Sequence, residues 1–256
     1  MNKLLIGERI LVIGAGGLLG TEITKHALEQ GASVIAVDLS LDYLQARLSK
    51  GGVDVTNPHL SLSSLDITVE QDVIRFFETN IVITGAVNCT YPRNKAYGAH
   101  FHDVKMSDFN ENLSLHLGSS FLFIQQCAKY FESNENRFSL VNISSIYGVI
   151  APKFEIYENT PMTMPVEYAA IKSAILHLSK YTIKYVNNSL FRINNVSPGG
   201  VFDNQPGPFL DAYKALTNGE GMLDVNDIVG TIIYLLSPLS QFVTGQNIIV
   251  DDGFTL

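Results

Sequence analysis

Cysteine, basic residues and long apolar runs are all scarce in this sequence. Only two cysteines occur, Cys89 and Cys127, too few for a disulfide framework and too far apart for a recognisable metal motif. Lysine and arginine number 17 against 25 acidic residues, and the formal net charge of -8 disfavours nucleic acid and anionic membranes, which attract basic clusters. We therefore expect no metal site, a reducing cytoplasm and a small molecule as the partner.

Nothing in the sequence indicates a membrane anchor or an interdomain linker. Residues 1–7 lack the apolar core of a signal peptide, and no stretch approaches ~20 uninterrupted apolar residues. Glycine and proline are scattered singly, with no low-complexity block and no repeat at a fixed period. The composition, 46% apolar over 256 residues, suits one large core. We expect a single domain over residues 1–256 that does not enter a membrane.

Short apolar runs alternate with helical patterns along the chain. Strands are expected at residues 9–13, 33–38, 83–88, 138–143, 191–196 and 247–250, with a further strand, the third in order, ending at Asp66 and Ile67. Helices are expected at residues 19–30, 69–78, 109–131, 166–187 and 225–236, with Thr68 and Asp224 as caps and Gly31 as a stop. This alternation predicts a doubly wound α/β fold of Rossmann type, with a seven-stranded parallel sheet and ligands at the carboxyl ends of its strands.

A glycine-rich turn follows the first predicted strand directly. It contains Gly14, Gly16, Gly17 and Gly20, and glycines here let the backbone approach a pyrophosphate at the start of the next helix. A merely tight turn is the alternative, but the second strand ends in Asp38, an acid at the distance expected for dinucleotide binding. A carboxylate there accepts hydrogen bonds from both ribose hydroxyls and repels a 2′-phosphate. Because no arginine immediately follows it, the sequence predicts NAD rather than NADP.

Polar groups also mark the ends of the next two predicted strands. The Asp66 side chain and the Ile67 backbone are expected to meet the adenine, and Asn88 is expected beside the adenosine ribose. Asp66 is equally well placed to cap the next helix together with Thr68, so its role stays open at this point.

A tyrosine and a lysine one helical turn apart are the candidate proton-transfer pair. Tyr168 and Lys172 lie four residues apart in a helical pattern, and a neighbouring ammonium is expected to lower the phenol pKa toward working pH. The same spacing recurs at Tyr91 and Lys95, but the intervening Pro92 makes a helical pair improbable there. Ser145 follows a predicted strand, 23 residues before Tyr168, and completes the candidate group.

In combination these motifs resemble those of the short-chain dehydrogenase/reductases. The shared pieces are the glycine turn, Asn88, Asn142-Ile-Ser-Ser145, Tyr168-x-x-x-Lys172, Ser197-Pro-Gly199, Thr244-Gly-Gln and Val250-Asp-Asp-Gly253. The resemblance implies that Tyr168 is the general acid/base, that Lys172 holds the nicotinamide ribose and that Ser145 binds the reacting oxygen. It also implies nicotinamide cofactor contacts at Leu19, Pro198, Gly199 and Val201.

The sequence departs from the family pattern at several positions. Ile13 and Leu18 replace the usual threonine and glycine of the glycine turn, and the usual Asn-Asn-Ala-Gly keeps only Asn88. His116 stands where the family has its catalytic asparagine, with Ser114 as the alternative alignment. We hypothesise that His116 links Lys172 through water to a proton path. A histidine packed at a subunit contact is the alternative.

Two long loops predict a substrate larger than a simple alcohol. One lies between Ser145 and Tyr168, and the other spans residues 201–222. The sequence around 146–168, 88–94 and 200–206 resembles flagellin-modification and legionaminic-acid-pathway dehydrogenases, which implies a sugar or sugar phosphate used in bacterial surface-glycan synthesis. Arg93 and Lys153 are candidate phosphate contacts, although loop cations are more often solvated surface charges.

The leading prediction is therefore an NAD-dependent oxidoreductase. Its alternative is a catalytically weak NAD-binding sensor or assembly protein of the same fold, suggested by His116 and the altered glycine turn. An epimerase or dehydratase would need a substrate domain, and only three residues follow the Val250–Gly253 motif. By family analogy we expect a homodimer or homotetramer.

Overall fold

Seven parallel strands form one sheet in this computed structural model, which describes residues 3–79 and 82–256. The sheet order is β3-β2-β1-β4-β5-β6-β7. The strands are β1 (Arg9–Ile13), β2 (Ser33–Asp38), β3 (Leu60–Ser64), β4 (Gly85–Asn88), β5 (Phe138–Ile143), β6 (Phe191–Pro198) and β7 (Asn247–Val250). The order reverses between β1 and β4, so the crevice for a ligand is expected at the carboxyl ends of these two strands.

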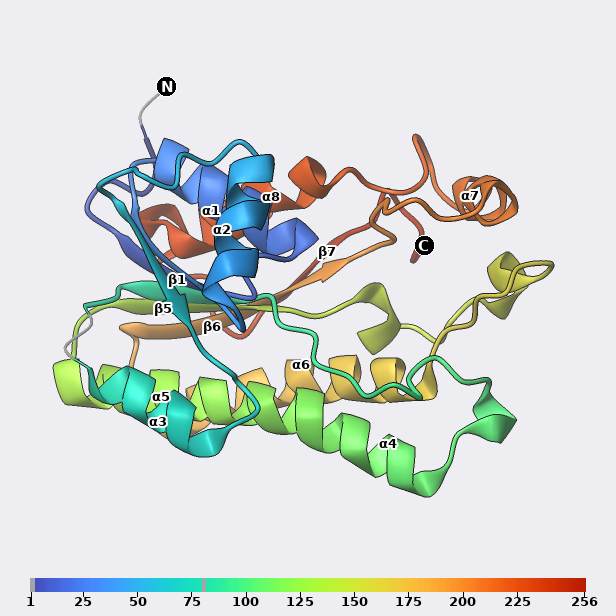
Figure 1. Ribbon diagram of the computed structural model, residues 1–256, viewed down its shortest axis with the longest axis horizontal. Coiled ribbons are helices and arrows are strands. Elements are labelled where there is room, and N and C mark those ends of the chain that lie inside the picture. Colours follow the sequence, from blue (N-terminus) through green and yellow to red (C-terminus); the bar gives the residue numbers. More distant parts are fainter. Residues whose placement is uncertain (1–2, 80–81) are drawn as a thin grey trace.

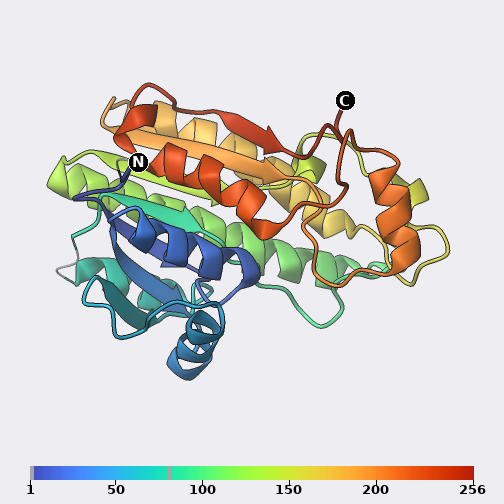
Figure 2. The same cartoon turned by 90° about the horizontal axis from the view of Figure 1, so that it is seen from above.

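Helices cover both faces of the sheet (Figures 1 and 2). On one face lie α1 (Leu18–Glu29), α2 (Leu41–Lys50) and α8 (Val225–Leu236), and on the other α3 (Glu70–Glu78), α5 (Ser119–Asn134) and α6 (Val166–Val186). The short α4 (Met106–Asn112) continues through a π-helical turn (Leu113–Gly118) into α5. Beyond the carboxyl ends of the strands lies α7 (Gly207–Lys214). Short 3₁₀ turns occur at Phe101–Asp103, Ile146–Gly148, Phe154–Tyr157 and Pro238–Ser240.

The apolar runs of the strands are explained by burial on both faces. In β1, Ile10 and Val12 pack with α1 and α8, whereas Leu11 and Ile13 pack with α5. Successive side chains of a strand point to opposite faces, so a strand between two helix layers needs apolar residues at every position. The predicted doubly wound fold with seven parallel strands is confirmed.

Several predicted boundaries were wrong. The third strand ends at Ser64, so Asp66 and Ile67 lie in the following loop. Thr68 does not cap α3, whose preceding residue is Val69; its amide and hydroxyl instead donate to Asp66 Oδ1, forming a local turn. By contrast, Asp224 caps α8 as expected, in a reciprocal capping box with Asp227.

The sequence prediction also missed two helices and one interruption. Helix α2 was not assigned, although Ser40 caps it and its buried Leu44 and Leu48 are four residues apart. Helix α7 lies inside the segment that we expected to be a loop. The helix predicted at 109–131 is interrupted by the π turn, in which the hydrogen bonds skip one extra residue, and this turn contains His116.

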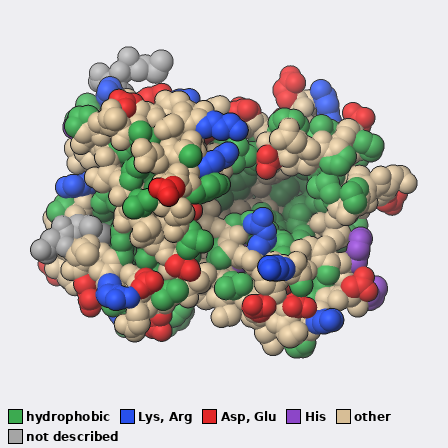
Figure 3. Space-filling view, viewed as in Figure 1, with side chains coloured by type: hydrophobic (Ala, Val, Ile, Leu, Met, Phe, Trp, Pro, Cys, Tyr) green, Lys and Arg blue, Asp and Glu red, His purple; other side chains and the backbone are tan. Residues whose placement is uncertain are grey.

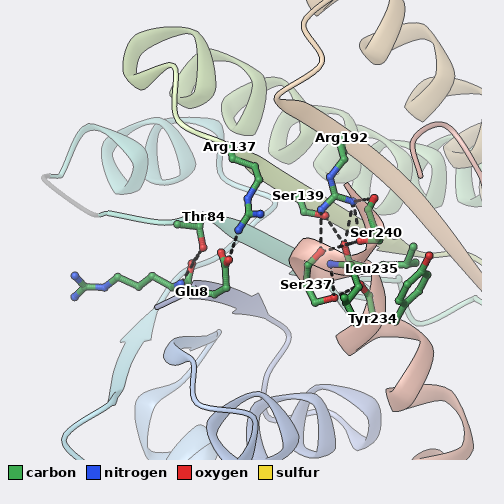
Figure 4. Close-up of polar contacts among 11 residues, drawn as sticks. Glu8, Thr84, Arg137, Ser139, Arg192, Tyr234, Leu235, Ser237 and Ser240 are labelled. Atoms are coloured by element: carbon green, nitrogen blue, oxygen red, sulfur yellow. Dashed lines mark hydrogen bonds and ion pairs between the residues drawn. The ribbon is translucent and has the colours of Figure 1, made fainter. Parts of the chain in front are cut away.

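At the amino ends of the strands, a buried arginine connects several segments to the sheet (Figure 4). Arg192, near the start of β6, donates through Nη1 to the carbonyls of Leu235 and Ser240 and to Ser240 Oγ. It also reaches the carbonyls of Ser237 and Val243, and so ties the end of α8 and the turn after it to the sheet. Nearby, Arg137 pairs with Glu8.

Candidate active site

A cavity of about 340 Å³ opens where the strand order reverses. Its lining includes Gly14, Gly17, Asp38, Asp66 and Ile67, all predicted cofactor contacts. These residues come from the carboxyl ends of β1 and β2 and from the loop after β3. The structure thus brings five residues from three separate segments to one cavity.

The glycine turn is shaped to let another group approach its backbone. Gly14 has a φ of +75°, and a β-carbon there would lie 2.9 Å from the Cys89 carbonyl carbon. A β-carbon at Gly20 would lie 2.1 Å from the Gly14 oxygen, so only glycine allows α1 to start against the turn. The turn places the amino end of α1 at the cavity, a favourable site for a pyrophosphate. The residues therefore fit a dinucleotide, which would supply hydride-transfer chemistry when bound.

A second cavity of about 440 Å³ lies beside the first and shares Cys89, Thr90 and Tyr91 with it. Its lining includes the predicted catalytic residues Ser145, Tyr168 and Lys172, and the predicted cofactor contacts Leu19, Pro198, Gly199 and Val201. Figure 3 shows a hollow with apolar side chains on its floor on this face of the molecule. Lys172 is the only Asp, Glu, Lys or Arg residue in this lining. The second cavity therefore offers hydroxyl groups, apolar surface and one cation.

Tyr168 and Lys172 lie close together in the lining of this cavity. Lys172 Nζ is 5.5 Å from the Tyr168 ring centroid and donates to the Ile143 carbonyl at 2.9 Å. Burial lowers the pKa of Lys172 from 10.5 to about 8. Burial likewise raises the pKa of Tyr168, while a hydrogen bond with Ser145 acts in the lowering direction. The expected lowering of the phenol pKa by Lys172 is not found in this structure, where burial is the largest influence on the phenol pKa and the Lys172 ammonium donates to a backbone carbonyl.

His116 is buried in the π turn and lies against Tyr91. Its ring centroid is 5.0 Å from that of Tyr91 in an edge-on arrangement, and its Nε2 atom has no hydrogen-bond partner among the described residues. Desolvation, followed by repulsion from Lys172 and Arg93, lowers the pKa of His116 to about 2. Burial therefore favours the neutral form of the His116 imidazole.

Tyr91 contacts both Tyr168 and Lys172, although the sequence analysis noted it only for its spacing from Lys95. Its ring lies edge-on to Tyr168, with centroids 5.5 Å apart, and Lys172 Nζ is 5.7 Å from its centroid. Its hydroxyl is hydrogen-bonded to that of Tyr97. The departure from the family pattern after Asn88 was the available signal, because it puts a large ring where a glycine is usual.

The remaining predicted residues lie nearby but contact other groups. The Asn88 side chain accepts from the Thr90 amide and hydroxyl and so holds the turn after β4. Arg93 is exposed, with its guanidinium 4.8 Å from the Tyr91 ring centroid. Lys153 donates to the Phe254 carbonyl at 2.7 Å and lies over the Phe254 ring, so its ammonium is directed to the C-terminal segment rather than to the cavity.

The two long loops noted in the sequence, between Ser145 and Tyr168 and at residues 201–222, meet in a small apolar cluster that contributes to the lining of the second cavity. Tyr147 and Tyr157, from the segment before α6, pack with Phe209 and Tyr213 of α7 and with Phe254. The Tyr213 hydroxyl oxygen also accepts a hydrogen bond from the Gly200 amide at 2.6 Å. The two loops are therefore packed against each other and against Phe254.

Comparison with known proteins identifies the family. The model for the family described as "Enoyl-(Acyl carrier protein) reductase" matches residues 14–255. This chain belongs to the short-chain dehydrogenase/reductase family. It is 38% identical to the post-translational flagellin modification protein A of Campylobacter coli, over 96% of this chain and 98% of the relative. It is 26% identical to 7alpha-hydroxysteroid dehydrogenase of Bacteroides fragilis, over 96% and 94% of the two chains.

Solved structures of the family agree with this fold. A short-chain dehydrogenase from Leptospira borgpetersenii with bound NAD+ matches with a TM-score of 0.85 and 29% identity, covering 97% of this chain and 93% of that one. A gluconate 5-dehydrogenase from Burkholderia cenocepacia, in complex with NADP and tartrate, matches with a TM-score of 0.83 and 22% identity, over 99% and 98% of the chains. This short-chain dehydrogenase/reductase is thus an oxidoreductase that uses a nicotinamide cofactor.

Among residues 3–79 and 82–256, no helix is long and apolar enough to cross a membrane. The same residues contain no group of three or more His, Cys, Asp and Glu side chains that could hold a metal ion.

Proposed function

We propose that this protein transfers a hydride between NAD(H) and a hydroxyl or ketone of a sugar or sugar phosphate in bacterial surface-glycan synthesis. The observation that carries the proposal is that Ser145, Tyr168 and Lys172 line the second cavity, directly beside the first cavity, which Asp38 lines. The 38% identity to a flagellin modification protein supports the glycan setting, including nonulosonic acids and flagellin glycans.

The three catalytic side chains suit proton transfer to a substrate oxygen. Tyr168 and Ser145 are hydroxyl donors, and two donors directed at one oxygen stabilise the negative charge that develops on a carbonyl during reduction. Because burial raises the pKa of Tyr168, the phenol holds its proton and can donate it to that oxygen. Lys172 keeps a positive charge beside the phenol at neutral pH and would hold the nicotinamide ribose.

Asp38 supports NAD as the cofactor. Its Oδ2 accepts the Gly16 amide and its Oδ1 accepts the Leu39 amide, both at 2.8 Å, which fixes the carboxylate at the rim of the first cavity. A fixed carboxylate favours two ribose hydroxyls over a 2′-phosphate. The other cofactor contacts in the proposal are Gly14, Gly16, Gly17, Leu19, Gly20, Asp66, Ile67, Asn88, Pro198, Gly199 and Val201.

The second cavity supports a polyhydroxylated substrate. The tyrosines 91, 97, 147, 157 and 213 contribute rings and hydroxyls to its lining, beside Met162, Met164 and Met222. A sugar ring alternates C–H and O–H groups, so it matches a wall that is apolar and hydrogen-bonding in turn. Arg93 is the proposed contact for a phosphate or carboxylate outside the cavity. Lys153 can serve the same purpose only by leaving its Phe254 contact.

His116 is proposed to act as a neutral relay between Lys172 and a water chain, in place of the family asparagine. Its unpartnered, buried Nε2 supports this role. His116→Asn should retain turnover within about threefold, whereas His116→Ala should lower it about tenfold and shift the alkaline limb of the pH profile. Full turnover with an unchanged pH profile in His116→Ala would remove the relay from the proposal.

We further propose a cytoplasmic homodimer or homotetramer. Phe121, Tyr181 and Tyr185 are exposed beside a groove of about 300 Å³ between α5 and α6. Exposed aromatic side chains grouped in this way are typical of subunit interfaces. Tyr181→Glu/Tyr185→Glu should lower the assembly state in sedimentation velocity, and an unchanged assembly would place the interface elsewhere.

The test of the whole proposal is an absorbance assay at 340 nm. Purified protein is supplied with NAD+ or NADH and a panel of sugars, amino sugars and their phosphates, and Tyr168→Phe is the matched control. We expect turnover with at least one member, reduced about 10³-fold or more in Tyr168→Phe. If NADH binds but no member of a broad panel reacts, the catalytically weak NAD-binding protein becomes the better description.

A further inference from the structure

Two side chains of α2 reach across to the glycine turn after β1. Arg47 Nε donates to the Gly16 carbonyl at 3.0 Å, and Tyr43 lies one helical turn earlier on the same helix. A β-carbon added at Gly16 would lie 2.8 Å from Tyr43 Cε1 and 3.1 Å from its Cδ1. The ring of Tyr43 therefore packs directly on the backbone of Gly16.

Asp38 lies over the same glycine. Its Oδ2 accepts the Gly16 amide at 2.8 Å and would lie 3.1 Å from the same added β-carbon. The position of a β-carbon added at Gly16 is thus about equally close to the Tyr43 ring and to the Asp38 carboxylate. Both residues line the first cavity, so ring and carboxylate share one corner of the dinucleotide site.

We propose that Tyr43 determines cofactor choice by occupying the space beside Asp38 that the 2′-phosphate of NADP(H) would need. The inference rests on the proposed function in that the adenosine ribose lies at Asp38. The carboxylate repels a phosphate, but a charge at a cavity rim is screened within about 8 Å at physiological salt. A ring excludes the phosphate by volume, which salt does not weaken.

Arg47 is assigned a positioning role. An arginine near a ribose would ordinarily attract a 2′-phosphate through a bidentate contact. Here its Nε is hydrogen-bonded to the Gly16 carbonyl, and its half-buried side chain comes from the same helix face as Tyr43. It holds the glycine turn against the ring, and this arrangement serves both cofactors alike.

The test measures binding of NADH and NADPH rather than turnover, so it needs no substrate. The chain has no tryptophan, and cofactor emission can be titrated without that background. We expect the wild type to prefer NADH. Tyr43→Ala should tighten NADPH binding about tenfold while NADH changes less than about threefold. Tyr43→Phe, which keeps the ring, is the matched control and should retain the wild-type preference. Tyr43 is half exposed, so the alanine variant is expected to fold.

Each alternative result has a distinct meaning. A wild type that prefers NADPH contradicts the proposed NAD dependence itself. A wild type that prefers NADH, with the same ratio in Tyr43→Ala, overturns only the steric inference, as does an equal loss of both cofactors in Tyr43→Ala. Arg47→Gln should weaken both cofactors equally. A selective loss of NADPH would make Arg47 a phosphate ligand and overturn its assigned role.

Charge and volume can then be separated. Asp38→Asn and Tyr43→Ala, alone and combined, form a double-mutant cycle for the NADPH to NADH ratio. At 0.5 M NaCl, where the effect of charge is screened, the remaining preference for NADH over NADPH should be removed by Tyr43→Ala. Asp38→Asn should change this preference only slightly. A preference that disappears in Asp38→Asn alone would assign the selectivity to charge.

Discussion

Arg192 and Lys172 are both buried cations, but they lie at opposite ends of the sheet and have very different surroundings. Arg192, 2% exposed, donates to four backbone carbonyls and one hydroxyl at the amino ends of the strands (Figure 4). Lys172, 5% exposed, donates to one carbonyl, that of Ile143 at the carboxyl end of β5. Neither forms an ion pair with a described carboxylate within residues 3–79 and 82–256.

The difference shows how one chain assigns the same kind of charge to two purposes. Buried charges are stable only when fixed dipoles replace the water they lose. Around Arg192 the replacement is extensive, and the guanidinium connects α8, the turn after it and β6. An ammonium has three donors, and Lys172 uses one, so it remains able to bind a ligand in the second cavity. We expect Arg192 to stabilise the fold and Lys172 to destabilise it in exchange for function.

Replacing Arg192 should produce the largest change in stability. Arg192→Met leaves several buried carbonyls without donors, and the free energy of unfolding should fall by about 4 kcal/mol. Urea unfolding followed by circular dichroism measures this. If the variant does not accumulate folded, Arg192→Lys, which keeps the charge but loses the fork of donors, should still lose about 2 kcal/mol. Unchanged stability in both Arg192 variants would show that its hydrogen bonds to the carbonyls do not stabilise this end of the sheet.

Replacing Lys172 should act in the opposite direction. A pKa lowered from 10.5 to about 8 corresponds to a burial penalty of about 3 kcal/mol for the charged form. Lys172→Met removes this penalty but leaves the Ile143 carbonyl without its donor, so unfolding should become harder by about 2 kcal/mol at pH 7. The same urea titration gives the sign. If Lys172→Met were less stable than the wild type, Lys172 would stabilise the fold as Arg192 does.

The stability gap between Lys172→Met and the wild type should depend on pH. Below pH 8 the folded wild type carries the full penalty of a charged Lys172. Between about pH 8 and 10.5 the folded state has lost this proton while the unfolded state retains it, so wild-type stability rises relative to the variant. The gap at pH 9.5 should be smaller than at pH 7 by about 2 kcal/mol. Arg192 stays charged throughout, so the gap between Arg192→Met and the wild type should not change.

The smallest effect expected is at Ser240. Its hydroxyl accepts from Arg192 at 2.9 Å and donates to the Leu235 carbonyl at 2.8 Å. Ser240→Ala removes one of several acceptors, and the free energy of unfolding should fall by about 1 kcal/mol. A loss as large as that in Arg192→Met would show that the serine, rather than the carbonyls, positions the guanidinium.

Much of the fold could be predicted because its signals are local. Strands buried on both faces are continuous apolar runs, and β1, β2, β5 and β7 were placed with their observed bounds. Helix α2 was missed because its apolar stripe is short and most of its residues are exposed. The π turn was missed because the spacing of apolar residues does not distinguish it from an α-helix.

The site was predictable where the chemistry follows motifs and not where it follows packing. Ser145, Tyr168 and Lys172 line one cavity, as their motif implied. The contacts of Tyr43, Arg47 and Tyr91 join segments far apart in the sequence, so they required the folded chain. The phenol pKa was misjudged for the same reason, because desolvation depends on everything around Tyr168 and not on Lys172 alone.

The last residues of the chain contact both of the segments that border the second cavity. Phe254 stacks on Tyr213 of α7 and receives Lys153 from the loop before α6, while Asp252 accepts the amides of Gly219 and Gly221. The C-terminal segment thus contacts both the loop before α6 and the segment that contains α7. Deleting the last five or six residues would remove these contacts and loosen both segments. A purification tag appended after the exposed Leu256 would leave the contacts of Asp252 and Phe254 in place.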